Sequence, residues 1–320
     1  MSEDDFAADL DLLPIRLEVA DRFDGWRLDH FIHARIPRLS RNRIQRMLRA
    51  QRRYSGVVLR PAQRVRAGQR LVIWRPAPIE PEVPRTFGVI YQDQQLLAID
   101  KPAGLPVHAT ARFFRNTLTA VLRERFPAGE VPNICHRLDR ETSGLMLLAR
   151  THRAEVELKQ AFFQRRVNKA YLAIVRGDPG DEGTIDQPIG PDSESGIRIR
   201  RMVGEQGQPA CTLFRRIERR GAFSLVEARP VTGRQHQIRV HLAWLGTPVV
   251  GDKLYGVDPS IFLEYTDHGW SEEMREQLLL PRQALHAARA HLIHPETGEP
   301  LTLECPLSAD LQRFWADLPR

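Results

Sequence analysis

The sequence predicts an α+β fold with two domains. At 320 residues the chain is long enough for one sizeable core and a small extra module. A proline-rich stretch at 76–84 favours extended geometry and separates two parts of different composition. Beyond that stretch, the expected strands and helices follow one another without the regular alternation of a doubly wound sheet. We therefore expect α+β architecture.

Composition divides the chain into four segments. Residues 1–13 form an acidic leader with the composition of a disordered segment, and residues 14–78 form a small basic domain. Residues 79–85 are the proline-rich linker, and residues 86–320 make the larger domain.

The positive charge of the chain is concentrated in residues 14–78. The formal charge is +7 in total, yet this segment has 16 Arg, no Lys and four acidic residues. The leader is acidic, and residues 79–320 are close to neutral. Such clustering indicates a polyanionic partner. A general preference for arginine explains 43 Arg against 4 Lys, but it does not explain the asymmetry between the two parts.

Two helices and two short strands are expected in the basic domain. Trp26–Ile32 begins an amphipathic helix, and Ser40 is a suitable N-cap for a second one. The strands are expected at 57–59 and 71–74. Four arginines share one face of the second helix: Arg41, Arg43, Arg46 and Arg49. Since no acidic residue compensates them, we expect this face to bind nucleic acid rather than only water.

The larger domain has six expected strands and five expected helices. The strands are 96–99, 145–149, 169–175, 212–217, 223–228 and 301–304. The helices are 117–126, 153–164, 234–245, 272–280 and 309–315. The run 144–149 is entirely apolar apart from its glycine, which indicates a fully buried strand.

One carboxylate, Asp139, stands just before this buried strand. Arg137 and Arg140 flank it and favour its ionised form, and the strand would draw the loop into a partly dry cleft. An ionised acid in such a place is a candidate catalytic group. The alternative is a structural salt bridge, because ion-pair networks also perturb carboxylates.

Five blocks in order resemble the motifs of the RluA family of pseudouridine synthases. They are 96–108 (LLAIDKPAGLPVH), 136–144 (HRLDRETSG), 168–177 (NKAYLAIVRG), 232–256 (TGRQHQIRVHLAWLGTPVVGDKLYG) and 285–307 (LHAARAHLIHPETGEPLTLECPL). The resemblance implies a mainly antiparallel mixed sheet with a central RNA-binding cleft. It also implies isomerisation of specific uridines in structured RNA, with no metal or organic cofactor.

Four residues receive roles from this resemblance. Asp139 matches the catalytic aspartate, which either attacks C1′ or abstracts the C2′ proton to make a glycal. Arg239 matches the arginine that pairs with it, and Tyr171 the tyrosine that stacks against the flipped uracil. Arg137 matches the position whose side chain enters the vacated RNA stack.

The basic domain resembles the S4 RNA-binding module. Such modules usually have a Gly-x-Val-x-Val-Asn-Gly turn after the second helix, and this chain departs from it at Gln51–Val57. Large-subunit ribosomal RNA is the expected substrate, with transfer RNA as the alternative.

Two other functions remain open at this point. An RNA-binding or ribosome-assembly factor without catalysis would not need Asp139, Tyr171 and Arg239 together. A hydrolase of nucleosides would need a second acid or a metal-bound water. The isomerisation is redox-neutral and needs one carboxylate, which fits the absence of dinucleotide-binding motifs from the sequence.

We expect a cytoplasmic monomer that binds neither membrane nor metal. No stretch approaches the roughly 18 apolar residues of a spanning helix, and no apolar run follows a positive N-terminus. The three cysteines are odd in number and far apart, which indicates neither disulfides nor zinc. The histidine groups 236/241 and 286/291/294 lack the spacing of a helical zinc site.

Overall fold

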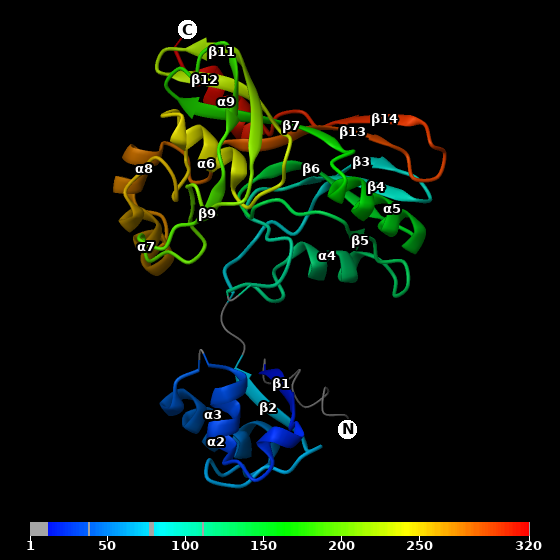
Figure 1. Cartoon of the computed structure of the whole chain (residues 1–320), viewed down its shortest axis with the longest axis vertical. Helices are drawn as coiled ribbons and strands as arrows, with labels where there is room; N and C mark the ends of the chain where they lie inside the picture. Colours follow the sequence, from blue (N-terminus) through cyan, green and yellow to red (C-terminus); the bar gives the residue numbers. More distant parts are fainter. Residues whose placement is uncertain (1–11, 38, 77–79, 111, 320) are drawn as a thin grey trace. The chain divides into compact units, whose positions relative to one another are not determined.

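The computed structural model describes residues 12–37, 39–76, 80–110 and 112–319. The chain separates into two compact units, Met1–Ile79 and Glu80–Arg320 (Figure 1). Within the described residues, no helix has the length and apolar character needed to cross a membrane.

The N-terminal unit packs two helices against a two-stranded antiparallel sheet. Its elements are β1 (Leu12–Glu18), the short 3-10 helix η1 (Asp21–Phe23), α2 (Leu28–Arg35), α3 (Arg41–Ser55) and β2 (Arg70–Pro76). Helix α3 begins as predicted, because the Ser40 hydroxyl accepts the backbone N–H of Arg43. Gln51 fixes α3 to β2, since its amide both donates to and accepts from the backbone of Trp74, at 2.6 and 2.7 Å.

One strand predicted in this unit is wrong, and another strand was not predicted. Residues 57–59 form no strand, and Val57 and Val58 are exposed. The following residues bond to the start of α2 instead, where Leu28 and Asp29 donate to carbonyls of Gln63 and Pro61. The partner of β2 is therefore β1, which includes Leu12 and Leu13 of the predicted leader. Residues 1–11 of that leader lie outside the described residues.

The C-terminal unit contains a ten-stranded, mostly antiparallel sheet, which confirms the predicted fold class. Eight strands lie in the order β3-β4-β6-β13-β7-β12-β11-β8, with β5 beside β6 and β14 beside β13 (Figure 1). Their bounds are β3 (Gly88–Gln92), β4 (Leu96–Lys101), β5 (Asn133–Ile134), β6 (Ser143–Ala149), β7 (Asn168–Arg176), β8 (Glu182–Asp186), β11 (Cys211–Arg220), β12 (Phe223–Pro230), β13 (Leu285–Ile293) and β14 (Pro300–Glu304). A separate pair is formed by β9 (Ile189–Pro191) and β10 (Arg201–Val203).

Six helices accompany these strands. They are α4 (Leu118–Arg125), α5 (His152–Phe163), α6 (Gln237–Trp244), α7 (Pro259–His268), α8 (Glu272–Leu278) and α9 (Ala309–Asp317). Five of them match predicted helices, whereas α7 was not predicted. Helix α6 begins three residues later than predicted, because the Gln237 amide oxygen accepts from both the hydroxyl of Thr232 and the backbone N–H of Arg234. That arrangement keeps the residues before α6 as a loop.

Strand β13 joins the two halves of the sheet. It runs parallel to β6 and antiparallel to β7, and the parallel contact is limited to two residue pairs, His286 with Ser143 and Ala287 with Gly144. Gly144 has a φ of +104°, and a Cβ there would lie 2.3 Å from the Ala287 carbonyl oxygen. Only glycine therefore permits this contact, five residues after Asp139.

The connector between the units is shorter than predicted. Glu80 belongs to the C-terminal unit, where its carboxylate accepts the backbone N–H groups of Arg115 and Asn116 at 2.8 Å each. Val83 packs against the core of the same unit. Residues 77–79 lie outside the described residues.

Candidate active site

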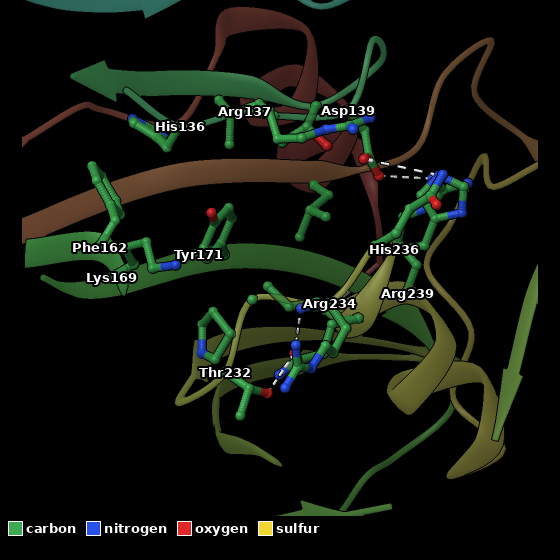
Figure 2. Close-up of a pocket in the computed structure, with 18 of the residues that line it drawn as sticks. His136, Arg137, Asp139, Phe162, Lys169, Tyr171, Thr232, Arg234, His236 and Arg239 are labelled. Atoms are coloured by element: carbon green, nitrogen blue, oxygen red, sulfur yellow. Dashed lines mark hydrogen bonds and ion pairs between the residues drawn. The ribbon is translucent and has the colours of Figure 1, made fainter. Parts of the chain in front are cut away.

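A pocket of about 490 Å³ lies where the loop before β6 meets β7 and the loop before α6. The residues that matter for its chemistry are Arg137, Asp139, Phe162, Lys169, Tyr171 and Arg239 (Figure 2). Three of the five motif blocks thus contribute side chains to one cavity. Asp139, Tyr171 and Arg239 are brought together there.

The loop that contains Asp139 is held by a buried lysine. The ammonium of Lys101 is fully buried and donates to the carbonyls of Pro102, Leu105 and Arg140 at 2.7, 3.0 and 3.2 Å. Burial lowers the pKa of Lys101 to about 7, while the charge of Asp139 opposes that shift. Lys101 therefore ties the ends of two loops together beside the pocket.

Asp139 forms an ion pair with Arg239 at the side of the pocket. Its Oδ2 accepts from Nη1 of Arg239 at 2.8 Å, and its Oδ1 lies 3.9 Å from Nε2 of His236. The side chain of Asp139 is 20% exposed, whereas that of Arg239 is 6% exposed. The carboxylate thus faces the cavity while its partner stays inside the protein (Figure 2).

A second carboxylate holds Arg239 from the other side. Asp252 accepts from Nε and Nη2 of Arg239 at 2.6 and 2.8 Å, a bidentate arrangement. The side chain of Asp252 is fully buried, and its Oδ1 also accepts the backbone N–H groups of Leu254 and Tyr255. The Tyr255 ring lies 5.1 Å from the guanidinium. Each of the three guanidinium nitrogens therefore donates to a carboxylate.

The electrostatic balance keeps Asp139 ionised. Burial raises the pKa of this carboxyl, but His236, Arg239 and hydrogen bonds from Arg239 and Gln283 lower it below its ordinary value. His236 has a pKa of about 4, chiefly because of burial, so it is neutral at pH 7. Arg239 is therefore the cation that matters at neutral pH.

The arginines next to Asp139 in sequence do not supply this charge. Arg140 turns to Glu141, to which it donates at 2.8 Å, and Arg137 is exposed at the pocket wall. The expectation that these neighbours stabilise the carboxylate is wrong, because the loop directs their side chains elsewhere. Arg239, one hundred residues further along, takes that place.

Tyr171 reaches the pocket from the middle of the sheet. It lies on β7, and its ring packs in the hydrophobic core of the C-terminal unit. Burial raises the pKa of its phenol, and the charge of Asp139 adds to that effect, so the phenol stays protonated. Among the described residues, no group forms a hydrogen bond with this hydroxyl. It is therefore available to a ligand (Figure 2).

An aromatic and basic group forms the other end of the pocket. The ring of His136 lies 4.4 Å from that of Phe162, and the ammonium of Lys169 lies 5.8 Å from the Phe162 ring. Burial lowers the pKa of His136 to about 3, so this side chain is neutral. Nε2 of His136 accepts the backbone N–H of Leu147 at 2.9 Å, which anchors the motif to β6.

The four arginines predicted to bind nucleic acid belong to the N-terminal unit. All four are exposed on α3, and none forms an ion pair within the described part of the chain. Sequence reasoning missed Asp252 and His236 as members of the site. The signal for Asp252 was its place between Gly251 and Lys253 in a motif block, yet nothing in the sequence indicates that it contacts Arg239.

Comparisons with known proteins agree with this geometry. Residues 95–244 match the model of a family described as RNA pseudouridylate synthase. A protein of Chloroflexus aurantiacus named "Uncharacterized RNA pseudouridine synthase" is 40% identical over 295 residues, which are 89% of this chain and 88% of that protein. "Ribosomal large subunit pseudouridine synthase D" of Xanthomonas campestris is 37% identical over 309 residues, covering 94% and 91%. The solved structure of human RNA pseudouridylate synthase domain containing 4 is 27% identical, with a TM-score of 0.57, and the match covers 73% of this chain and 95% of that one.

Proposed function

Because this chain belongs to the RluA family of RNA pseudouridine synthases and is therefore an isomerase, we propose that its target is a specific uridine in large-subunit ribosomal RNA. Several relatives bear the name of large-subunit enzymes, among them those of Xanthomonas campestris and Pseudomonas aeruginosa. Transfer RNA is the alternative substrate. Asp139, held ionised by Arg239 in the pocket wall, is the observation that carries the proposal.

The proposed chemistry uses one carboxylate. Asp139 either attacks C1′ of the target nucleotide or removes the proton from C2′, and in both cases the N1–C1′ bond breaks. The freed uracil rotates and forms a bond from C5 to C1′. The C5 proton is then lost, and N1 gains one. No electrons enter or leave, so the pocket needs only to hold the base and exclude water.

The remaining side chains of the pocket have supporting roles in this proposal. The Tyr171 ring stacks against the flipped uracil, and its free hydroxyl can hydrogen-bond the base. Arg137, exposed at the pocket wall, enters the space that the base leaves in the RNA stack. Arg239 keeps Asp139 ionised and oriented rather than contacting RNA.

The N-terminal unit is proposed to add affinity for RNA. The exposed cations on α3 can neutralise phosphates, and each phosphate contact releases counterions. An S4-like role for this unit agrees with two helices followed by a strand, and it remains a prediction from the sequence.

Mapping of pseudouridine in RNA tests the proposal. The wild-type protein and the Asp139→Asn variant are incubated separately with deproteinised large-subunit ribosomal RNA and with transfer RNA. We expect new pseudouridine at defined positions of ribosomal RNA with the wild type and none with the variant, which should still bind. Modification of transfer RNA alone would reassign the substrate. Binding without any product would favour the catalytically silent RNA-binding factor.

A further inference from the structure

Phe163 is the most exposed large hydrophobic side chain in the described part of the chain, with 88% of its surface open to solvent. A single exposed apolar residue is common and by itself indicates nothing. Phe163, however, also forms part of the wall of the pocket that contains Asp139 and Tyr171. An aromatic ring at the rim of an RNA-modifying pocket is accessible to an unstacked base.

The chain holds Phe163 at a fixed corner between α5 and β7. Phe163 is the last residue of α5, and the backbone N–H groups of Arg165 and Arg166 donate to carbonyls of that helix at 3.1 and 2.8 Å. Lys169 and Tyr171 follow at the start of β7 and line the same pocket. The corner therefore presents Phe163 at the rim and Tyr171 deeper inside.

The neighbouring phenylalanine is already engaged. Phe162 is partly buried, packs against the core of the C-terminal unit, and contacts His136 and Lys169 (Figure 2). The ring of Phe163 has no aromatic or cation contact within the described residues. It contributes little to the core, so its aromatic character is free for a ligand.

The charges around Phe163 identify the kind of ligand. Arg137, Arg165 and Lys169 lie on the pocket wall or at the same corner, and none has a carboxylate within ion-pair distance among the described residues. Arg166 bonds to the side chain of Gln164 at 2.8 Å. An apolar protein partner would have to desolvate these cations without compensation. A nucleotide instead offers a base for the ring and a phosphate for the cations.

We propose that Phe163 is a stacking platform for the base of a nucleotide adjacent to the target uridine. The target base itself stacks on Tyr171, which is nearly buried, so the base that meets Phe163 at the rim belongs to a neighbour in the RNA. This role rests on the proposed function and extends it. Phe163 then favours uridines whose neighbour can leave the RNA stack.

Fluorescence of 2-aminopurine reports such stacking directly. The base analogue is placed on either the 5′ or the 3′ side of a loop uridine in a ribosomal RNA hairpin that the protein binds. Wild-type protein is expected to quench the analogue on one side, Phe163→Leu to lose that quenching, and Phe163→Tyr to retain it. Val156→Ala, at an exposed position of α5 outside the pocket, is the matched control and should behave as wild type.

Affinity measurements complete the test. Loss of one base–aromatic stack is expected to weaken binding of the hairpin by Phe163→Leu ~5- to ~150-fold. An abasic site on the stacked side should weaken the wild type by the same factor and leave Phe163→Leu unaffected. If both proteins respond equally to abasic sites on both sides, Phe163 is not a platform. Turnover is measured in parallel: a wild type that binds and stacks but forms no pseudouridine contradicts the proposed function alone.

Discussion

Arg239 is clamped by Asp252 before it meets Asp139. Two of its nitrogens bond to Asp252 at 2.6 and 2.8 Å, which leaves Nη1 as the one directed at Asp139. Asp252 is itself fixed by two backbone N–H groups. The position of the pocket carboxylate is therefore set by a buried residue that does not line the cavity.

Substitution of that buried residue should impair turnover without removing RNA binding. Asp252→Asn cannot accept two charge-assisted hydrogen bonds, so the guanidinium loses its fixed direction. We expect the rate of the bound complex to fall by about 10- to 100-fold, the loss that a misplacement of about 1 Å can cause. Single-turnover assays and binding titrations measure the two effects separately.

The matched control for this experiment is Asp178→Asn. Asp178 also pairs with arginines, Arg216 and Arg219, but this group lies outside the pocket. The control should have wild-type rates. A normal single-turnover rate for Asp252→Asn would show that Arg239 needs no second carboxylate.

Removal of Arg239 should affect both stability and activity. Arg239→Met leaves two carboxylates near each other without their cation, and breaking a buried pair costs about 3 to 5 kcal/mol. Thermal or denaturant unfolding measures this loss of unfolding free energy. A variant as stable and as active as the wild type would contradict the assigned role of the ion pair.

The acid limb of the pH–rate profile should report the pKa of Asp139. Its ionised form is the active one, and the folded-state pKa lies below the ordinary value of about 3.9, so activity should persist until the pH falls through that lower value. In Arg239→Met, burial remains while the cation is gone, so the limb should move to higher pH. The same ion pair stabilises the fold above pH ~4 and ceases to do so as the pH falls through the lowered pKa. Single-turnover rates from pH 4 upward, measured on both proteins, check the direction.

The hydroxyl of Tyr171 can be tested apart from its ring. Tyr171→Phe keeps the stacking surface and removes a group that has no protein hydrogen-bond partner among the described residues. We therefore expect the fold to be as stable as in the wild type. Strong loss of turnover with unchanged binding would assign chemistry to the hydroxyl. Near-normal turnover would leave stacking as its function.

The two units can be separated between residues 79 and 80. A chain that starts at Glu80 retains the contacts of that residue with the backbone of Arg115 and Asn116, so we expect it to fold. It should bind RNA more weakly and with a shallower salt dependence, by ~0.9 per lost phosphate contact on duplex or ~0.7 on single strands in the log-log slope. Affinity titrations across salt with the same RNA compare it with the full chain. An unchanged slope would mean that the arginines of α3 do not contact that RNA.

Sequence patterns were informative where local chemistry decides the structure. The buried strand β6 and the N-caps Ser40 and Thr117 followed from apolar runs and capping residues. Strand β13 was missed, because its alanines and histidines carry no strand signal and it forms only by filling the space between β6 and β7. Asp252 was missed for the same reason, since its role depends on a tertiary contact with Arg239.

The place of β13 in the sheet has a consequence for biogenesis. The half of the sheet that carries Asp139 is complete by residue 149, and the half that carries Tyr171 by residue 230, yet the strand that joins them begins only at residue 285. During synthesis, a ribosome-bound chain therefore holds both halves before they can pair. Such late, non-local pairing is slow compared with local folding. The nascent enzyme should thus stay unable to modify RNA until nearly its whole length has emerged.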